Sequence, residues 1–214
     1  KELRSVFRWI VWLALPIAVI TFFARGYVVA FIKNGGQPAI ASVLGALVIS
    51  IFFRTLYHIM ARTFYAQQDT RTPLYISIAT ISLNILLAIV FTQLFGWGVF
   101  GLAWAQSIVS VVEIAILLTI LHVRTPGIFN RKTLHSIITM MIASAIMGVV
   151  TYFVVQMLQL QSRDMNFMAV FPKFTVIVVV SFAVYIALSK VFKLEEADPI
   201  VAKLRQLLFG RVRR

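Results

Sequence analysis

The chain has 214 residues, 61% of them hydrophobic, and a mean hydropathy of +0.94; soluble domains are roughly 45–50% apolar, so the composition predicts an integral membrane protein. Cysteine is absent, which excludes disulfides and thiolate metal sites. The net charge of +13 could indicate a nucleic-acid partner, but the basic residues lie in the gaps between apolar blocks, where membrane proteins carry topology signals, so no nucleic-acid partner is expected.

The apolar residues form six blocks, each close to or above the roughly 20 residues that a spanning helix needs. The blocks cover about residues 7–32, 38–66, 73–95, 99–123, 134–158 and 170–192. Pro16 in the first block is expected to kink its helix, and Arg25 near the far end is expected to reach the membrane interface. The second block is long enough to tilt or to protrude from the bilayer.

Small and polar side chains interrupt the third and fourth blocks. Asn84 in the third block can hydrogen-bond to a neighbouring helix, as can several hydroxyl side chains before it. Gly101 and Ala105 in the fourth block are spaced for close helix packing. These positions are therefore predicted to hold helices together.

The residues after Lys193 have the pattern of an amphipathic helix. Asp198 can cap it with Pro199 at its first position. The apolar residues that follow fall on one face and the other positions are rich in Lys and Arg, which is typical of a helix lying on a membrane. The predicted fold is all-α: a polytopic bundle of six transmembrane helices plus a C-terminal basic amphipathic helix.

The basic residues are distributed unevenly between the two sides of the membrane. When the residues just inside the block ends are included, fifteen lie around the start of the first block and the ends of the second, fourth and sixth blocks, whereas the other side has three, Lys33, Arg163 and Lys173. Because cytoplasmic loops carry the excess of Lys and Arg, both termini are predicted to be cytoplasmic.

The most polar run between two apolar blocks is Ala61–Pro73. Pro73 disfavours helix at Thr72, so Thr72 and Pro73 are interpreted as the cap and first position of the next helix. Asp69 can accept backbone N–H groups there. Taken by residue type alone, Arg62 and Arg71 are ordinary topology charges and Asp69 is a cap.

The same run, R-x-F-Y-A-x-x-D-T-R-T-P, resembles the signature of the MurJ/MviN lipid II flippases, a branch of the multidrug/oligosaccharidyl-lipid/polysaccharide exporter superfamily. Its filled positions are Arg62, Phe64, Tyr65, Ala66, Asp69, Thr70, Arg71, Thr72 and Pro73. Asn84, L-P-I-A-V at 15–19 and G-V-F-G-L-A-W-A at 98–105 also resemble family positions. Phe64, Tyr65, Asp69, Arg71 and Pro73 are predicted to form a structural turn motif.

The resemblance implies a protein of fourteen helices, of which this chain supplies helices nine to fourteen. Residues 1–123 are then the last four helices of the second lobe, 124–192 an extra C-terminal helix pair, and 193–214 a cytoplasmic interfacial tail. The implied function is part of a lipid II flippase that works by alternating access across the bacterial cytoplasmic (inner) membrane. Its partners would be undecaprenyl-pyrophosphate-linked precursor, membrane lipids and the remaining N-terminal helices of the parent protein.

Four charged or titratable residues within or beside the blocks are the substrate or coupling candidates. Arg54, His58 and Arg62 are spaced i, i+4, i+8 on one helix face, which suits a lipid-linked pyrophosphate. The alternative for this face is a helix end whose long side chains reach the cytoplasmic headgroups, which is the favoured interpretation for Arg62 and stands equally beside the first for Arg54. Glu113 has the same predicted depth as Arg54, so the two either form an ion pair, the favoured interpretation, or both face a polar cavity; a role for Glu113 in ion coupling is a further possibility.

Two other functions remain open from the sequence. One is an exporter of another lipid-linked oligosaccharide or of a small cation; the other is a non-transporting membrane scaffold. The sequence contains no Gly-rich phosphate loop, G-x-S-x-G or H-E-x-x-H motif. We therefore expect neither an enzyme nor a bound cofactor or metal.

Overall fold

The computed structural model describes residues 2–32, 37–124, 131–158, 167–194 and 196–197, and every regular element within these ranges is helical. The elements are α1 (Glu2–Phe23), α2 (Arg25–Ile32), α3 (Pro38–Ala66), α4 (Arg71–Ile89), the π-helix η1 (Val90–Leu94), α5 (Gly98–Arg124), α6 (Arg131–Met157) and α7 (Phe167–Val191). Six segments of the described part are long and apolar enough to cross a membrane. The predicted polytopic all-α fold is confirmed, whereas the amphipathic helix after Asp198 lies outside the described residues.

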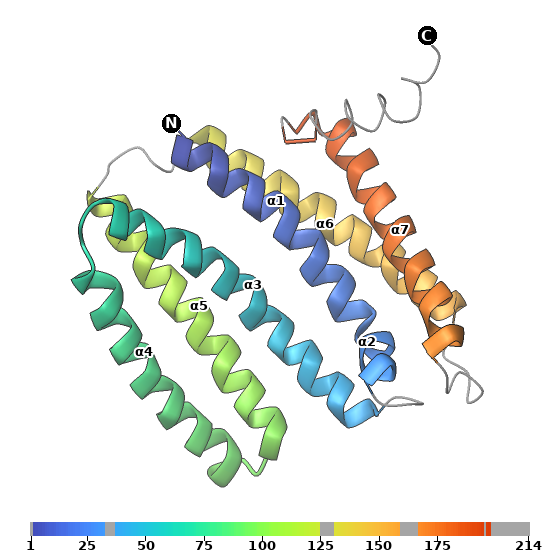
Figure 1. Cartoon of the computed structure of the whole chain (residues 1–214), viewed down its shortest axis with the longest axis horizontal. Coiled ribbons are helices and arrows are strands. Elements are labelled where there is room, and N and C mark those ends of the chain that lie inside the picture. The colour runs from blue at the N-terminus through green and yellow to red at the C-terminus, as the bar shows by residue number, and fades with distance from the viewer. Residues whose placement is uncertain (1, 33–36, 125–130, 159–166, 195, 198–214) are drawn as a thin grey trace.

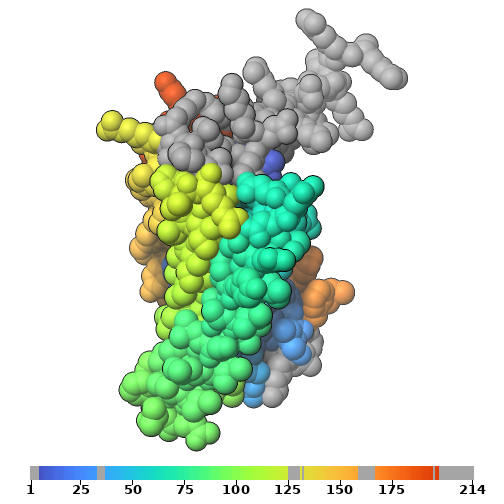
Figure 2. Space-filling model, turned by 90° about the vertical axis from the view of Figure 1, so that its left-hand side faces the viewer, coloured from blue at the N-terminus to red at the C-terminus, as the bar shows by residue number. Residues whose placement is uncertain are grey.

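The helices pack as two groups that meet along α1 and α3 (Figure 1). In one group α5 packs against both α3 and α4; in the other, α6 packs against α1 and α7. In the view of Figure 2, α4 and the neighbouring ends of α3 and α5 cover the face turned to the reader. Because α4 buries little of its surface inside this structure, its apolar side chains are free to contact lipid or other helices.

The main core lies toward the end of the bundle that holds the start of α1 and the ends of α3, α5 and α7. Its largest fully buried side chains include Trp12, Phe64, Leu117 and Tyr185. Trp12 donates a hydrogen bond from Nε1 to Ser189 Oγ at 3.1 Å, which joins α1 to α7. A second apolar cluster around Tyr27 and Ile177 lies where α2 meets α7.

The first apolar block divides at Ala24 and not at Pro16. Pro16 lies inside α1, whereas α2 begins at Arg25. The guanidinium Nη1 of Arg25 donates to the carbonyl of Phe22 at 2.9 Å, and its carbon lies 4.8 Å from the centre of the Phe22 ring. A side chain that satisfies a freed carbonyl stabilises such a break in a membrane helix, so Arg25 has a local role here.

The third apolar block ends in one π-helical turn. The amide of Phe95 bonds to the carbonyl of Val90 at 3.1 Å, and the ring of Phe91 stacks on Trp97 with 5.4 Å between centroids. Gly101 approaches this turn so closely that a Cβ on it would lie 2.9 Å from Cβ of Phe91. Gly101 therefore permits α5 to pack against η1, and Ala105 one turn later is fully buried.

The chain turns at the end of α7, and the described residues after Lys193 are buried. Lys193 has a positive φ of 53°, and the amide of Leu194 bonds to the carbonyl of Ser189 at 2.9 Å. This arrangement ends the helix. Leu194, Glu196 and Ala197 are buried, so the first residues of the predicted tail belong to the core.

Candidate functional site

A polar cavity of about 170 Å³ lies between α3, α4 and α5. Its lining residues are Arg54, Tyr57, His58, Ser77, Thr80, Ile81, Asn84, Val109 and Glu113. Arg54 follows the start of α3 by sixteen residues and Glu113 follows the start of α5 by fifteen, so both lie near the middle of a spanning segment. Arg54 and His58 are exposed, which means that the cavity reaches the surface of the described structure.

Glu113 is buried, with 9% of its surface exposed, and is held by hydroxyl groups of α4. Its Oε1 accepts hydrogen bonds from Ser77 Oγ at 3.3 Å and from Thr80 Oγ1 at 3.2 Å. Ser77 Oγ also lies 2.8 Å from the hydroxyl of Tyr57 on α3. The carboxyl group is thus surrounded by hydroxyl groups that can each donate or accept a hydrogen bond.

The guanidinium of Arg54 bonds to the side-chain amide of Gln106 on α5. Because a guanidinium only donates, the amide oxygen of Gln106 must face it. In that orientation the oxygen accepts from Nε of Arg54 at 2.9 Å and also from Nη2. The amide nitrogen of Gln106 then faces the side-chain amide of Asn84, 2.6 Å away. This chain of contacts links α3, α5 and α4.

Arg54 and Glu113 lie in one cavity but do not form the ion pair that the sequence favoured. Among the described residues, ion pairs join Arg8 to Glu196 and Arg124 to Asp69, and none joins Arg54 to Glu113. The reason is that each charged group is hydrogen-bonded to neutral side chains instead. The guanidinium bonds to Gln106, and the carboxylate bonds to Ser77 and Thr80. Of the two alternatives, the shared polar cavity is the one found.

The predicted cationic face of α3 is divided between two sites. Arg54 and His58 line the polar cavity, whereas Arg62 lines a separate groove with Val6 and Ile10 of α1. At 3.6 residues per turn, eight residues rotate a side chain by roughly 80° about the helix axis. An i, i+4, i+8 series therefore drifts around the helix, and Arg62 does not join the other two.

The sequence signature forms the turn between α3 and α4. Asp69 Oδ1 accepts the backbone N–H of Thr72 at 3.0 Å, which confirms its role as a helix cap. Helix α4 begins at Arg71, so Pro73 lies inside the first turn and not at its first position. A proline is tolerated there because the first-turn amides lack helical partners.

The carboxylate of Asp69 also pairs with Arg124 at the end of α5. Hydrogen bonds from the side chain and backbone of Thr72, followed by the one from Arg124, lower the pKa of Asp69 well below its usual value. Phe64 is fully buried and its ring centre lies 5.7 Å from the guanidinium carbon of Arg124. Tyr65 and Arg71 are exposed. The turn motif thus joins the ends of α3, α4 and α5.

Three contributors to these sites were not predicted from the sequence. Gln106 and Tyr57 bind cavity residues, and Arg124 binds the turn motif. Ser77 and Thr80 were expected only to bridge helices. A polar side chain inside an apolar block was the available signal for Gln106, but the partner of such a side chain depends on how two helices pack.

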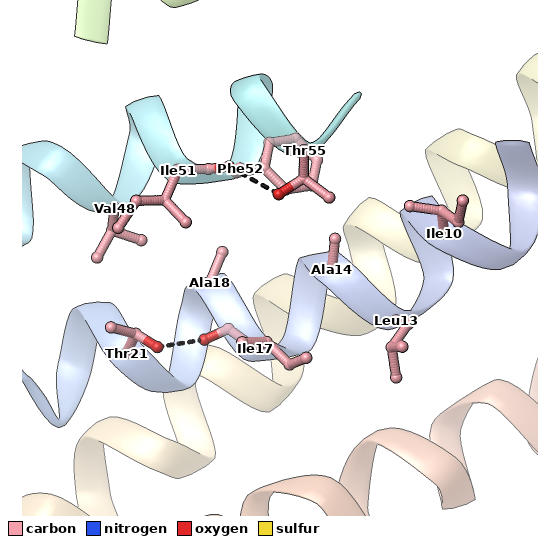
Figure 3. Close-up of a pocket in the computed structure, with 10 residues that line it drawn as sticks. All are labelled: Ile10, Leu13, Ala14, Ile17, Ala18, Thr21, Val48, Ile51, Phe52 and Thr55. Atoms are coloured by element: carbon pink, nitrogen blue, oxygen red, sulfur yellow. Dashed lines mark hydrogen bonds between the residues drawn. The ribbon is translucent and has the colours of Figure 1, made fainter. Parts of the chain in front are cut away.

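A second cavity, of about 220 Å³, is almost wholly apolar and lies between α1 and α3 (Figure 3). Ile10, Ala14 and Ile17 line it from α1, and Ile51 and Phe52 line it from α3. The hydroxyl groups of its two threonines donate to carbonyls of their own helices, Thr21 to Ile17 and Thr55 to Ile51. This pocket therefore offers apolar contacts and few free polar groups.

Comparison with known proteins identifies relatives over most of the chain. The family model described as lipid II flippase MurJ matches residues 1–173. The chain is similar to a probable lipid II flippase MurJ of Vibrio cholerae, 27% identical over 63% of this chain and 24% of the relative. It is also similar to a probable lipid II flippase MurJ of Thermotoga maritima, 28% identical over 76% of this chain and 30% of the relative. The chain thus spans about a quarter to a third of these curated relatives.

A solved structure described as lipid II flippase MurJ, inward closed conformation, has the same fold. The TM-score is 0.71 at 20% identity, and the match covers 89% of this chain and 38% of the other.

Proposed function

This chain belongs to the lipid II flippase MurJ family, and from this premise we propose that it forms part of a flippase for a lipid-linked peptidoglycan precursor. The cargo would cross the bacterial inner membrane by alternating access, without chemical change. Because the chain spans about a quarter to a third of its curated relatives, the remaining helices of the parent protein are proposed partners.

The observation that carries the proposal is the exposed guanidinium of Arg54 halfway along a spanning helix. A charged side chain at the bilayer centre costs about 2.5–3.5 kcal/mol on insertion scales, and more in simulations, so it faces water or protein and not lipid tails. His58, Asn84 and Glu113 line the same cavity. We infer that this side of α3, α4 and α5 faces a water-filled path through the complete protein.

The chemistry of the cavity suits a phosphate-containing cargo. Gln106 occupies two of the five N–H donors of the Arg54 guanidinium, which leaves three for another acceptor. Guanidinium groups bind phosphate oxygens in pairs and hold their orientation. Arg54 is therefore the proposed contact for the pyrophosphate of lipid II, with His58 beside it.

The division of the chain and its orientation are part of the same proposal. Residues 1–123 would complete the second lobe, 124–192 would form the extra pair, and both termini would be cytoplasmic because of the fifteen-to-three distribution of basic residues. Alternating access then requires this lobe to rock against a second one around a site near the midplane.

The function is tested with the full-length protein in cells from which their own lipid II flippase is depleted. The measured quantity is the fraction of lipid II accessible from outside the cell. Wild-type protein should restore it, and Arg54→Gln should lower it at equal protein level. Lys190→Gln is the matched control, because Lys190 is an exposed cation near the end of α7, outside the cavity and the turn motif. Failure of the wild-type protein to restore accessibility would contradict the proposal.

A further inference from the structure

We propose that Glu113 is a proton-binding site that sets the charge of the polar cavity, so that a phosphate group and a proton bind together. The inference rests on the proposed function, because the phosphate belongs to the pyrophosphate of a lipid-linked cargo. It goes further by assigning the carboxyl group a role in binding and by giving that binding a pH dependence.

The charges that face Glu113 come from one neighbouring helix. Arg54, Tyr57 and His58 of α3 line the cavity with it. The cavity residues of α4 carry no ionisable group, and neither does η1, the other element that packs against α5. With His58 neutral, ionised Glu113 cancels the charge of Arg54 and the cavity is neutral. Protonated Glu113 leaves the cavity with a net charge of +1.

The partners of Glu113 suit both of its protonation states. Ser77 and Thr80 bond to it through hydroxyl groups, and a hydroxyl can donate to a carboxylate or accept from a carboxylic acid. A permanent ion pair with Arg54 would instead favour the ionised form alone. Because the guanidinium bonds to Gln106, a proton can join or leave Glu113 without breaking an ion pair.

Anion binding at Arg54 then depends on Glu113. An ionised carboxylate in the same cavity repels a phosphate group, and its protonation removes the repulsion. Since linkage is reciprocal, a bound phosphate favours proton uptake by Glu113 as much as the proton favours phosphate binding. A cargo phosphate that enters the cavity therefore brings a proton with it, and both leave together when the phosphate is released.

The sign of the pH dependence follows from this linkage. When Glu113 is ionised in the free protein, each bound anion takes up one proton, so affinity falls as pH rises. One linked proton limits the fall to about tenfold per pH unit. Glu113→Gln mimics the protonated state, so the affinity of this variant for the anion should lack the pH dependence that Glu113 contributes.

The test measures binding of farnesyl pyrophosphate to the full-length protein in detergent between pH 5.5 and 8.5. The ratio of the Glu113→Gln affinity to the wild-type affinity should rise with pH, by up to about tenfold per unit. Ionisation of the ligand is common to both proteins and cancels in the ratio. Arg54→Gln should abolish most binding, whereas Arg62→Gln, outside the cavity, should leave the pH dependence unchanged.

A second measurement keeps the test decisive if the Gln variant does not fold. Calorimetry of the wild-type protein in two buffers of different ionisation enthalpy reports the protons taken up on binding, and His58→Gln separates any proton bound by the imidazole. An affinity ratio that is constant across pH, or proton uptake by the wild-type protein that disappears in His58→Gln, would overturn the inference. Absence of farnesyl pyrophosphate binding in a protein that still restores lipid II accessibility would overturn it too, while leaving the proposed function intact.

Discussion

The carboxylate of Asp69 and the guanidinium of Arg124 form an ion pair between two segments that lie 55 positions apart in the chain. The same carboxylate accepts hydrogen bonds from the backbone and the hydroxyl of Thr72, and Arg124 Nη2 also donates to that hydroxyl at 2.9 Å. One carboxyl group thus caps α4 and fixes the end of α5 beside it. In this structure the sequence signature therefore connects the start of α4 to the end of α5.

The first prediction is that Asp69→Ala acts on stability before it acts on transport. The substitution removes the cap of α4 and the partner of Arg124 together. Protein level and the melting temperature in detergent should fall, while transport per folded molecule stays close to wild type. Lys190→Ala, at an exposed position of α7 outside the turn motif, is the control. A stable Asp69→Ala protein that cannot transport would show instead that Asp69 contacts the cargo.

The second prediction concerns acid stability. The pKa of Asp69 is lowered in the folded protein by Thr72 and Arg124, whereas an unfolded Asp titrates near pH 4. A depressed folded pKa stabilises the protein above the unfolded pKa, and this stability is lost as pH falls toward the folded value. Melting temperatures measured from pH 7 down to pH 2.5 should therefore fall more steeply for wild type than for Asp69→Asn. Parallel curves would exclude this contribution.

The third prediction concerns the ion pair of Arg8 and Glu196, whose side chains are 13% and 4% exposed. Because both groups are largely buried, removing one partner leaves an uncompensated charge, at a cost of about 3–5 kcal/mol. Glu196→Gln should therefore lower the melting temperature markedly. The double variant Arg8→Met, Glu196→Leu should recover much of the loss, since apolar pairs often replace buried ion pairs without penalty. Lys190→Gln, at an exposed position of α7, is the control.

The fourth prediction is the orientation of the helices in the membrane. Single cysteines at Gly36 and Ser162, which lie outside the described residues, should react with an impermeant thiol reagent added outside the cell. A cysteine at Gln68, in the turn before α4, should react only after the membrane is opened. The reason is the excess of basic residues on the side of the turn. Labelling of the cysteine at position 68 in intact cells would contradict the predicted topology.

The fifth prediction is that Lys1–Arg214 alone cannot move lipid. Alternating access needs two lobes around a central site, and the chain matches only 38% of the solved family structure. Expression of this chain in cells depleted of their lipid II flippase should fail to restore growth, whereas the full-length protein succeeds. Comparable membrane levels of the two proteins are the control. Rescue by the chain alone would mean that it assembles into a complete transporter.

Much of the fold could be predicted because the start and end of each apolar block can be read directly in the sequence. The block predicted at residues 38–66 is α3, and the others agree with the observed helices within a few residues except where the backbone departs from a regular helix. Those departures, the break at Ala24 and the π-helix of Val90–Leu94, were missed. Both depend on contacts with neighbouring groups, namely Arg25 on the Phe22 carbonyl and the packing of Gly101 on Phe91.

Sequence alone was enough to predict the apolar segments, the bond that Asp69 accepts from a backbone N–H of the next helix, and the similar positions of Arg54 and Glu113 along their helices. Hydropathy, capping and rise per residue are local properties, so one chain segment suffices to fix them. The direction in which each side chain points from its helix is visible only in the packed bundle: Arg54 contacts Gln106, Glu113 contacts Ser77 and Thr80, and Arg62 lines a separate groove. Rotation and pairing depend on how whole helices pack, because a side chain bonds to the nearest group that packing brings within reach.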